Sequence, residues 1–201
     1  TFARGFTPPG PPATNFEENL KRLWWKLDKA LDSEDVYYSA LLSIMHAARA
    51  GCTTIIDHHA SPSCWEGSLD QVERAFRDVG LSGCLSYEVS DRNQPGEGIQ
   101  ENERYIKKCQ DSDDDQMAAL FGLHAQMTLG DRTLARCAEI AHGLETGFHV
   151  HAAEDLAVAA DHLRSHQPDL VLLDLSLPDG HGLDFYQDGM ERLEGIPVIV
   201  M

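Results

Sequence analysis

The sequence has few positively charged residues and no long apolar run. Lysine and arginine total 16, against 33 aspartate and glutamate residues, and the formal net charge is -17. A surface this acidic repels a phosphate backbone, so nucleic acid is excluded as an expected partner. No apolar segment reaches the roughly 18 residues that cross a bilayer, so we expect no membrane span.

Cysteine is also scarce, and the five cysteines stand singly without a CxxC pair. An odd number of isolated thiols is typical of a reduced protein and indicates a cytoplasmic location. The chain opens at Thr1 without an initiator methionine, so we expect that its true start is missing. With 42% hydrophobic and 24% charged residues, the composition is that of a globular protein with one sizeable core or two small ones.

Helical and extended patterns alternate along the chain. Residues 16–32 and 34–50 have apolar residues at helical spacing, and Ser33 is expected to cap the second helix. Six β-rich segments then alternate with helical ones, at residues 52–60, 81–90, 117–126, 147–154, 169–177 and 196–201. A polar loop is expected at 91–98. This alternation predicts an α/β fold with a parallel sheet and right-handed crossovers.

Histidines and acidic residues gather at the carboxyl ends of three predicted strands, where α/β folds place their sites. In chain order they are Asp57, His58, His59, His124, His149, His151 and Glu154. His149 and His151 are two residues apart and therefore point to the same side of a strand. Imidazole is a good ligand for zinc or iron(II), although a single strand-end histidine is more often structural. The convergence predicts a metal or substrate site.

Several short sequence segments, in collinear order, resemble those of a known family. They are "LWWKLDKALD", "GCTTIIDHHASP", "SYEVSDRN", "LHAQMTLGD" and "FHVHAAEDL". Through these segments residues 1–156 resemble the metal-dependent amidohydrolase superfamily, and within it the SsnA-type aminohydrolases. The resemblance implies part of a TIM-barrel-like fold whose divalent metal, zinc or iron, ionises a water that attacks a C–N bond of a small-molecule substrate.

The resemblance also implies roles for individual residues. His151 would be a metal ligand, Glu154 would hold the substrate and relay a proton to the leaving nitrogen, and His124 would contact the substrate. His149 is a weaker candidate ligand. Three further positions are candidates for lining the pocket without an assigned role: Asp57, His58 and His59. The family's other ligands are expected upstream of Thr1 or in strands that this chain does not match, so we expect hydrolysis by this chain to be negligible.

A second set of sequence motifs lies near the end of the chain, in the segment "VLLDLSLPDGHGLDFY" followed by "IPVIVM". An apolar strand ends in Asp174, where a carboxylate is exposed to ligands or caps the next helix. Residues 157–201 resemble part of a response-regulator receiver domain. The resemblance implies that Asp174 is the phosphoacceptor, that magnesium binds beside it, and that a histidine kinase is the partner. The receiver's other acidic residues have no counterpart here, so this magnesium site is expected to be incomplete.

Three interpretations remain open. The chain is an incomplete amidohydrolase-like hydrolase, a receiver-type phosphoacceptor module of a phosphorelay, or a non-catalytic chimeric scaffold of βα units. The expected fold is a partial barrel over residues 1–156, continued by flavodoxin-like βα units over residues 157–201. Open sheet edges near residues 52–56 and 196–200 predict oligomerisation.

Overall fold

The computed structural model describes residues 5, 10, 16–125, 128–151, 156–165, 167–168, 171–177, 179–189, 193 and 195–200. The chain divides into two compact units, residues 1–150 and 151–201. The division falls inside a strand, between Val150 and His151. Among the described residues, the helices are all too short or too polar to cross a membrane.

Helices and strands of the first unit follow one another as the sequence predicts. The described helical segments are α1 (Phe16–Asn19), the π-helical turn η1 (Leu20–Trp24), α2 (Trp25–Ala30), α3 (Ser33–Arg49), α4 (Ser68–Val79), α5 (Pro95–Gln110) and α6 (Asp131–Gly143). The described strands are β1 (Thr54–His59), β2 (Ser82–Tyr87), β3 (Met117–Ala119), β4 (Phe121–Ala125) and β5 (Phe148–His151), whose last residue lies beyond the division.

The strands lie in sequential order. β1 and β3 flank β2, and both pair with it in parallel. β4 pairs with β5, and its Leu123 forms a parallel bridge with Val89, two residues after β2. Only Leu120 separates β3 from β4, and its backbone N–H donates to the carbonyl oxygen of Leu85 in β2. An α/β fold with parallel strands is therefore confirmed.

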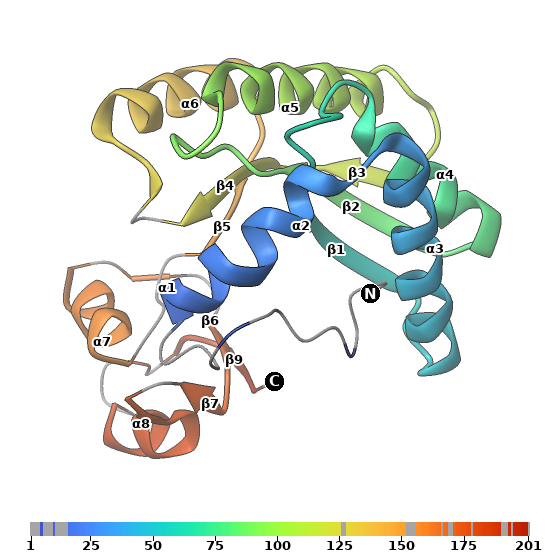
Figure 1. The fold of residues 1–201 in the computed structure, drawn as a ribbon. Coiled ribbons are helices and arrows are strands. Elements are labelled where there is room, and N and C mark those ends of the chain that lie inside the picture. The colour runs from blue at the N-terminus through green and yellow to red at the C-terminus, as the bar shows by residue number, and fades with distance from the viewer. Residues whose placement is uncertain are drawn as a thin grey trace. The chain divides into compact units, whose positions relative to one another are not determined.

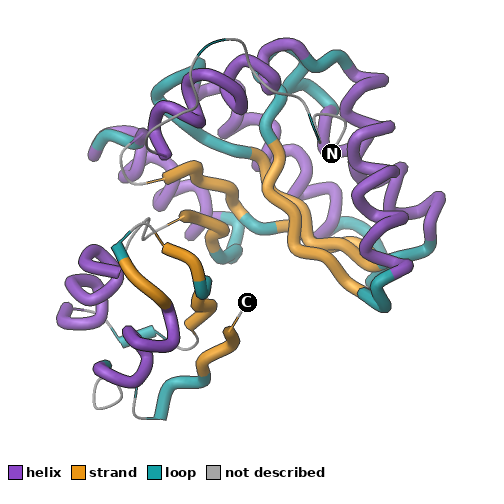
Figure 2. The backbone as a smooth tube through the Cα atoms, turned by 60° about the horizontal axis from the view of Figure 1, so that its bottom comes forward, coloured by secondary structure: helices purple, strands orange, loops and turns teal. Residues whose placement is uncertain are grey.

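Helices α3 to α6 lie on one side of these strands (Figure 1), and the tube in Figure 2 shows β1 and β2 running side by side. Apolar side chains of α4, including Leu69, Val72 and Phe76, are buried against β2. The buried Asn102 of α5 accepts the backbone N–H of Tyr87 and that of Gly122. One amide thereby joins the end of β2 to β4, which fixes where these two strands present their carboxyl ends.

The second unit contains shorter elements. Those described are α7 (Leu156–Ser165), β6 (Val171–Leu173), β7 (Ser176–Leu177), β8 (Gly180–His181), α8 (Gly182–Asp188) and β9 (Val198–Val200). β6 pairs in parallel with β9, whereas β7 and β8 form an antiparallel hairpin that the sequence did not predict. The Asp179 carboxylate accepts the N–H groups of Leu156 and Ala157 and so caps α7.

Three local expectations differ from the structure. Asp32, not Ser33, caps α3, because its carboxylate accepts two N–H groups of the first turn and Asp35 completes a capping box. The expected loop at 91–98 is shorter, because α5 begins at Pro95, whose fixed φ suits a first helical position. The expected strand at 117–126 is interrupted at Leu120.

Candidate functional site

Three histidines lie close together at the carboxyl ends of two strands. His58 is on β1, and His149 and His151 are on β5. One ligand nitrogen of each lies within 4.8 Å of the corresponding atoms of the other two. The rings of His58 and His149 meet edge to face with centroids 4.7 Å apart. The structure thus brings His149 and His151 together with His58, for which the sequence predicted only a pocket-lining position.

The curvature of the strands explains this contact. β2 and the continuous segment β3 and β4 separate β1 from β5. In a flat sheet, strands this far apart would be roughly 14 Å from one another, at about 4.8 Å per strand. Side chains of His58 and His149 meet only because the strands curl, as they do in a barrel, so that both histidines lie on the concave face.

Ser86 of β2 orients His149. Its hydroxyl donates to the backbone carbonyl oxygen of Asp57 at 2.9 Å, and that oxygen can only accept. The contact of 3.3 Å between Ser86 Oγ and His149 Nδ1 is therefore an N–H donated by the imidazole. This assigns the proton to Nδ1 and the lone pair to Nε2, which is the tautomer that a ligand histidine needs when its other nitrogen is held by a polar neighbour.

The donor set fits a transition metal. Three imidazoles with one position left for water is the composition of a catalytic zinc site, and imidazole also suits iron(II). Among the residues described here, no carboxylate lies close enough to join the three histidines as a ligand. His58, His149 and His151 are the residues that would hold the ion.

His124 lies in β4 and belongs to a different group of polar residues. Its Nδ1 is 2.8 Å from Thr128 Oγ1, whose hydroxyl donates to the carbonyl oxygen of Ala125. His124 Nδ1 is therefore the donor to Thr128, and its Nε2 faces Glu88 Oε2 at 3.8 Å. Burial raises the pKa of Glu88 to about 7, although Arg92 opposes this shift. Near neutral pH, Glu88 is thus able to hold or release a proton beside His124.

Arg92 and Asp28 extend this group toward α2. Arg92 pairs with Glu88 and stacks over the Trp25 ring, with its guanidinium carbon 4.3 Å from the ring centroid. Burial raises the pKa of Asp28 to about 6, with Arg92 again opposing. None of these four residues was predicted from the sequence to belong to a site. The four-residue spacing of Glu88 and Arg92 signals an ion pair only within a helix, and these residues lie after β2 outside the described helices.

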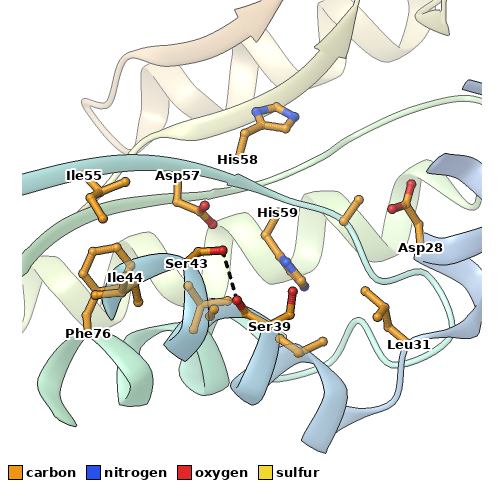
Figure 3. Close-up of a pocket in the computed structure, with 14 residues that line it drawn as sticks. Asp28, Leu31, Ser39, Ser43, Ile44, Ile55, Asp57, His58, His59 and Phe76 are labelled. Carbon is orange, nitrogen blue, oxygen red and sulfur yellow. Dashed lines mark hydrogen bonds between the residues drawn. The ribbon is translucent and has the colours of Figure 1, made fainter. Parts of the chain in front are cut away.

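Asp57 and His59 point to the other side of β1, toward α3 and α4, whereas His58 points away from them (Figure 3). Burial raises the pKa of Asp57 to about 6 and lowers the pKa of His59 to about 4. His59 Nε2 lies 2.8 Å from the hydroxyl of Ser61. Both residues line a cavity of about 230 Å³. The alternation of the strand therefore separates the three pocket candidates between two faces.

Two further predicted site residues are Asp174 and Glu154. Asp174 directly follows β6 in the second unit and is exposed. Glu154 falls outside the described residues, so its role as substrate ligand and proton relay stays a prediction. Asp174 is a candidate site within the second unit.

Parallel strands that curl, with histidines at their carboxyl ends, are typical of α/β proteins that bind a metal ion at this end of the strands. The sequence pattern of the amidohydrolase family matches residues 12–180. The chain belongs to the amidohydrolase family. The match continues past residue 156, where the sequence analysis expected a boundary.

Known proteins agree with this assignment. The chain is 27% identical over 150 residues to a 5-methylthioadenosine/S-adenosylhomocysteine deaminase of Thermoanaerobacter pseudethanolicus. This alignment covers 73% of this chain and 33% of that protein. It is 27% identical over 140 residues to a 5'-deoxyadenosine deaminase of Methanosarcina mazei, covering 68% of this chain and 31% of that protein. The fold resembles a zinc-bound adenosine deaminase of Xanthomonas campestris, with a TM-score of 0.61 and 17% identity over 94% of this chain and 39% of that one. The chain spans about a third of the length of these curated relatives.

Proposed function

We propose that this chain is part of a metal-dependent aminohydrolase that removes an amino group from a small molecule. The observation that carries the proposal is the convergence of His58, His149 and His151. The names of the relatives point to an aminopurine nucleoside, such as 5'-methylthioadenosine or 5'-deoxyadenosine, as the substrate class. Because the chain covers only about a third of those relatives, we propose deamination for a protein of their full length and metal binding for the chain as printed.

The residues on the concave face support this chemistry. A zinc or iron(II) ion, when bound, lowers the pKa of its water and so supplies a nucleophile. Ser86 fixes the tautomer of His149 and leaves its Nε2 lone pair for the ion. Thr128 holds His124 by Nδ1, so that Nε2 faces the carboxyl group of Glu88. Glu154 keeps its predicted role as the proton relay.

We further propose that the printed chain by itself hydrolyses slowly. The chain covers only about a third of the relatives' length, and the described part of the histidine cluster contains imidazoles alone. General bases contribute about 10²- to 10⁴-fold to such reactions, so a chain that lacks catalytic residues of the full-length protein is expected to be much slower. A metal that binds without rapid turnover is the expected behaviour of this chain.

Metal content tests the proposal first. The purified 201-residue chain is loaded with zinc, dialysed and analysed by elemental mass spectrometry, beside His151→Ala and the control His142→Ala, which changes an exposed histidine of α6. We expect about one zinc per chain in the wild type and the control, and loss of zinc in His151→Ala. Ammonia release from 5'-methylthioadenosine, with and without chelator, is measured on the same samples. A wild type that retains no zinc, or a His151→Ala variant that retains it fully, contradicts the proposal.

A second candidate function concerns the other unit. We propose that Asp174 accepts a phosphoryl group, as the receiver resemblance implies, with magnesium as the cofactor and a histidine kinase as the donor. The supporting observation is that Asp174 is exposed at the carboxyl end of β6, which pairs in parallel with β9. Acetyl phosphate with magnesium is the test: the carboxylate attacks phosphorus and acetate leaves. A mass increase that Asp174→Asn abolishes and Asp184→Asn does not is expected, and an unmodified wild type refutes this candidate.

A further inference from the structure

The cavity beside β1 lies between this strand and the helices, on the side from which the ring of His58 points away, although His58 is among the lining residues. Asp57 and His59 project into it from β1, and Ser39 and Ser43 of α3 face them (Figure 3). The hydroxyl of Ser43 donates to the carbonyl oxygen of Ser39. The volume is about 230 Å³. A site here shares only His58 with the histidine cluster and does not rest on the proposed deaminase function.

The charged side chains that line the cavity, among the described residues, are acidic. Asp57 and Asp28 supply two carboxyl groups, and the described residues that line the cavity include neither lysine nor arginine. The carboxylate of Asp57 accepts the backbone N–H of His58, which uses only part of its acceptor capacity. A partly enclosed carboxylate with little solvent and no cation beside it favours a positively charged ligand.

The other walls are apolar. Ile44 of α3, Ile55 of β1 and Phe76 of α4 line the cavity on the side of the helices. An apolar cavity of about 150 Å³ accommodates benzene, so a volume of about 230 Å³ has room for a ring and a short charged substituent. We propose that this cavity binds a small organic cation, an amine or amidine with an apolar body, whose charged nitrogen contacts Asp57.

The titratable neighbours agree with a cationic ligand. Asp28 from α2 and His58 and His59 from β1 are the titratable groups that line the cavity, while the lining residues from α3 and α4 are serine or apolar.

Benzylammonium is the probe for the test, and benzyl alcohol is its neutral analogue of matching shape. Binding of each to the full chain at pH 7.5 is measured by NMR titration, following the backbone amides of Ser39 and Ser43. The same titration is run on Asp57→Asn and on the control Asp111→Asn, which changes an exposed carboxylate after α5. Far-UV circular dichroism checks that each variant is folded.

We expect benzylammonium to bind the wild type and the Asp111→Asn control at least about tenfold more tightly than it binds Asp57→Asn, because a hydrogen bond to a charged group is lost. Benzyl alcohol should bind the wild type at least about tenfold more weakly than benzylammonium. This last comparison needs no variant and decides the proposal even if Asp57→Asn does not fold. Equal affinities for the two probes, shifts that spare Ser39 and Ser43, or no binding at all would overturn it.

Discussion

Replacing His58 with alanine tests whether three histidines act as one metal site. A zinc–nitrogen bond is about 2.0–2.1 Å long, so two ligand nitrogens of a tetrahedral site lie about 3.3 Å apart. The nitrogens of His58, His149 and His151 lie within 4.8 Å of one another. Each pair therefore has to close by at most about 1.5 Å, which small rotations of the imidazole side chains provide.

The expected loss of affinity is large. Removing the hydrogen-bonded partners of a metal ligand alone costs about 10- to 100-fold, so removing the ligand His58 itself should cost at least about 100-fold. With zinc at 100 times the wild-type dissociation constant, binding stabilises the folded wild type by about 2.7 kcal/mol. In His58→Ala the same zinc concentration only equals the dissociation constant, and the stabilisation falls to about 0.4 kcal/mol.

Thermal unfolding with and without zinc measures this difference. For a unit of about 150 residues, 1 kcal/mol corresponds to about 2–4 °C, so zinc should raise the Tm of the wild type by about 5–10 °C and that of His58→Ala by about 1 °C. His142→Ala on α6 is the control for general zinc binding by histidine. The reasoning is refuted if zinc shifts the Tm of His58→Ala as much as that of the wild type while the control behaves normally.

Three further perturbations address the framework of the site. Glu101 is fully buried, and its carboxylate accepts two backbone N–H groups and a hydrogen bond from the side chain of Arg104. Glu101→Ala should therefore lower the free energy of unfolding by about 3–5 kcal/mol in urea titrations. A loss below about 1 kcal/mol would contradict the reasoning. A Cβ atom at Gly122 would lie 2.2 Å from the carbonyl oxygen of Tyr87. Gly122→Ala should therefore lower the free energy of unfolding by about 1–3 kcal/mol in the same assay, and an unchanged midpoint of urea unfolding would refute the close approach. Burial raises the pKa of Asp57 from 3.8 to about 6, so the folded chain binds the proton more tightly and loses stability as pH rises through this range. In urea titrations, Asp57→Asn should therefore have a free energy of unfolding about 3 kcal/mol higher than that of the wild type at pH 7, and the same one below about pH 3.

The order of elements in the first unit could be predicted from its sequence because each signal is local. Alternating apolar residues and turn residues are read within a few positions, and they place the ends of β2 within three residues of those observed. The interruption at Leu120 could not be predicted in this way. It depends on the backbone bond from Leu120 to Leu85, which involves a neighbouring strand.

The candidate site was predicted in part for the same reason. The two-residue spacing of His149 and His151 is local, and in the structure their ligand nitrogens lie within 4.8 Å of each other. The participation of His58 depends on the curl that brings β1 near β5, which no short sequence window contains. The group around Glu88 depends on α2 packing against the end of β2 and was missed for that reason.

The register of β1 determines both candidate sites at once. Since side chains alternate, a shift by one residue would turn His58 toward the helices and Asp57 toward the histidine cluster. Ser86 opposes such a shift, because its hydroxyl bonds the backbone oxygen of Asp57 while its oxygen accepts the N–H of His149. It lies directly opposite His58 in the parallel pairing of β1 with β2. One hydroxyl on the middle strand thereby links the register of the strand that carries the cavity carboxylate to the orientation of a metal-ligand candidate.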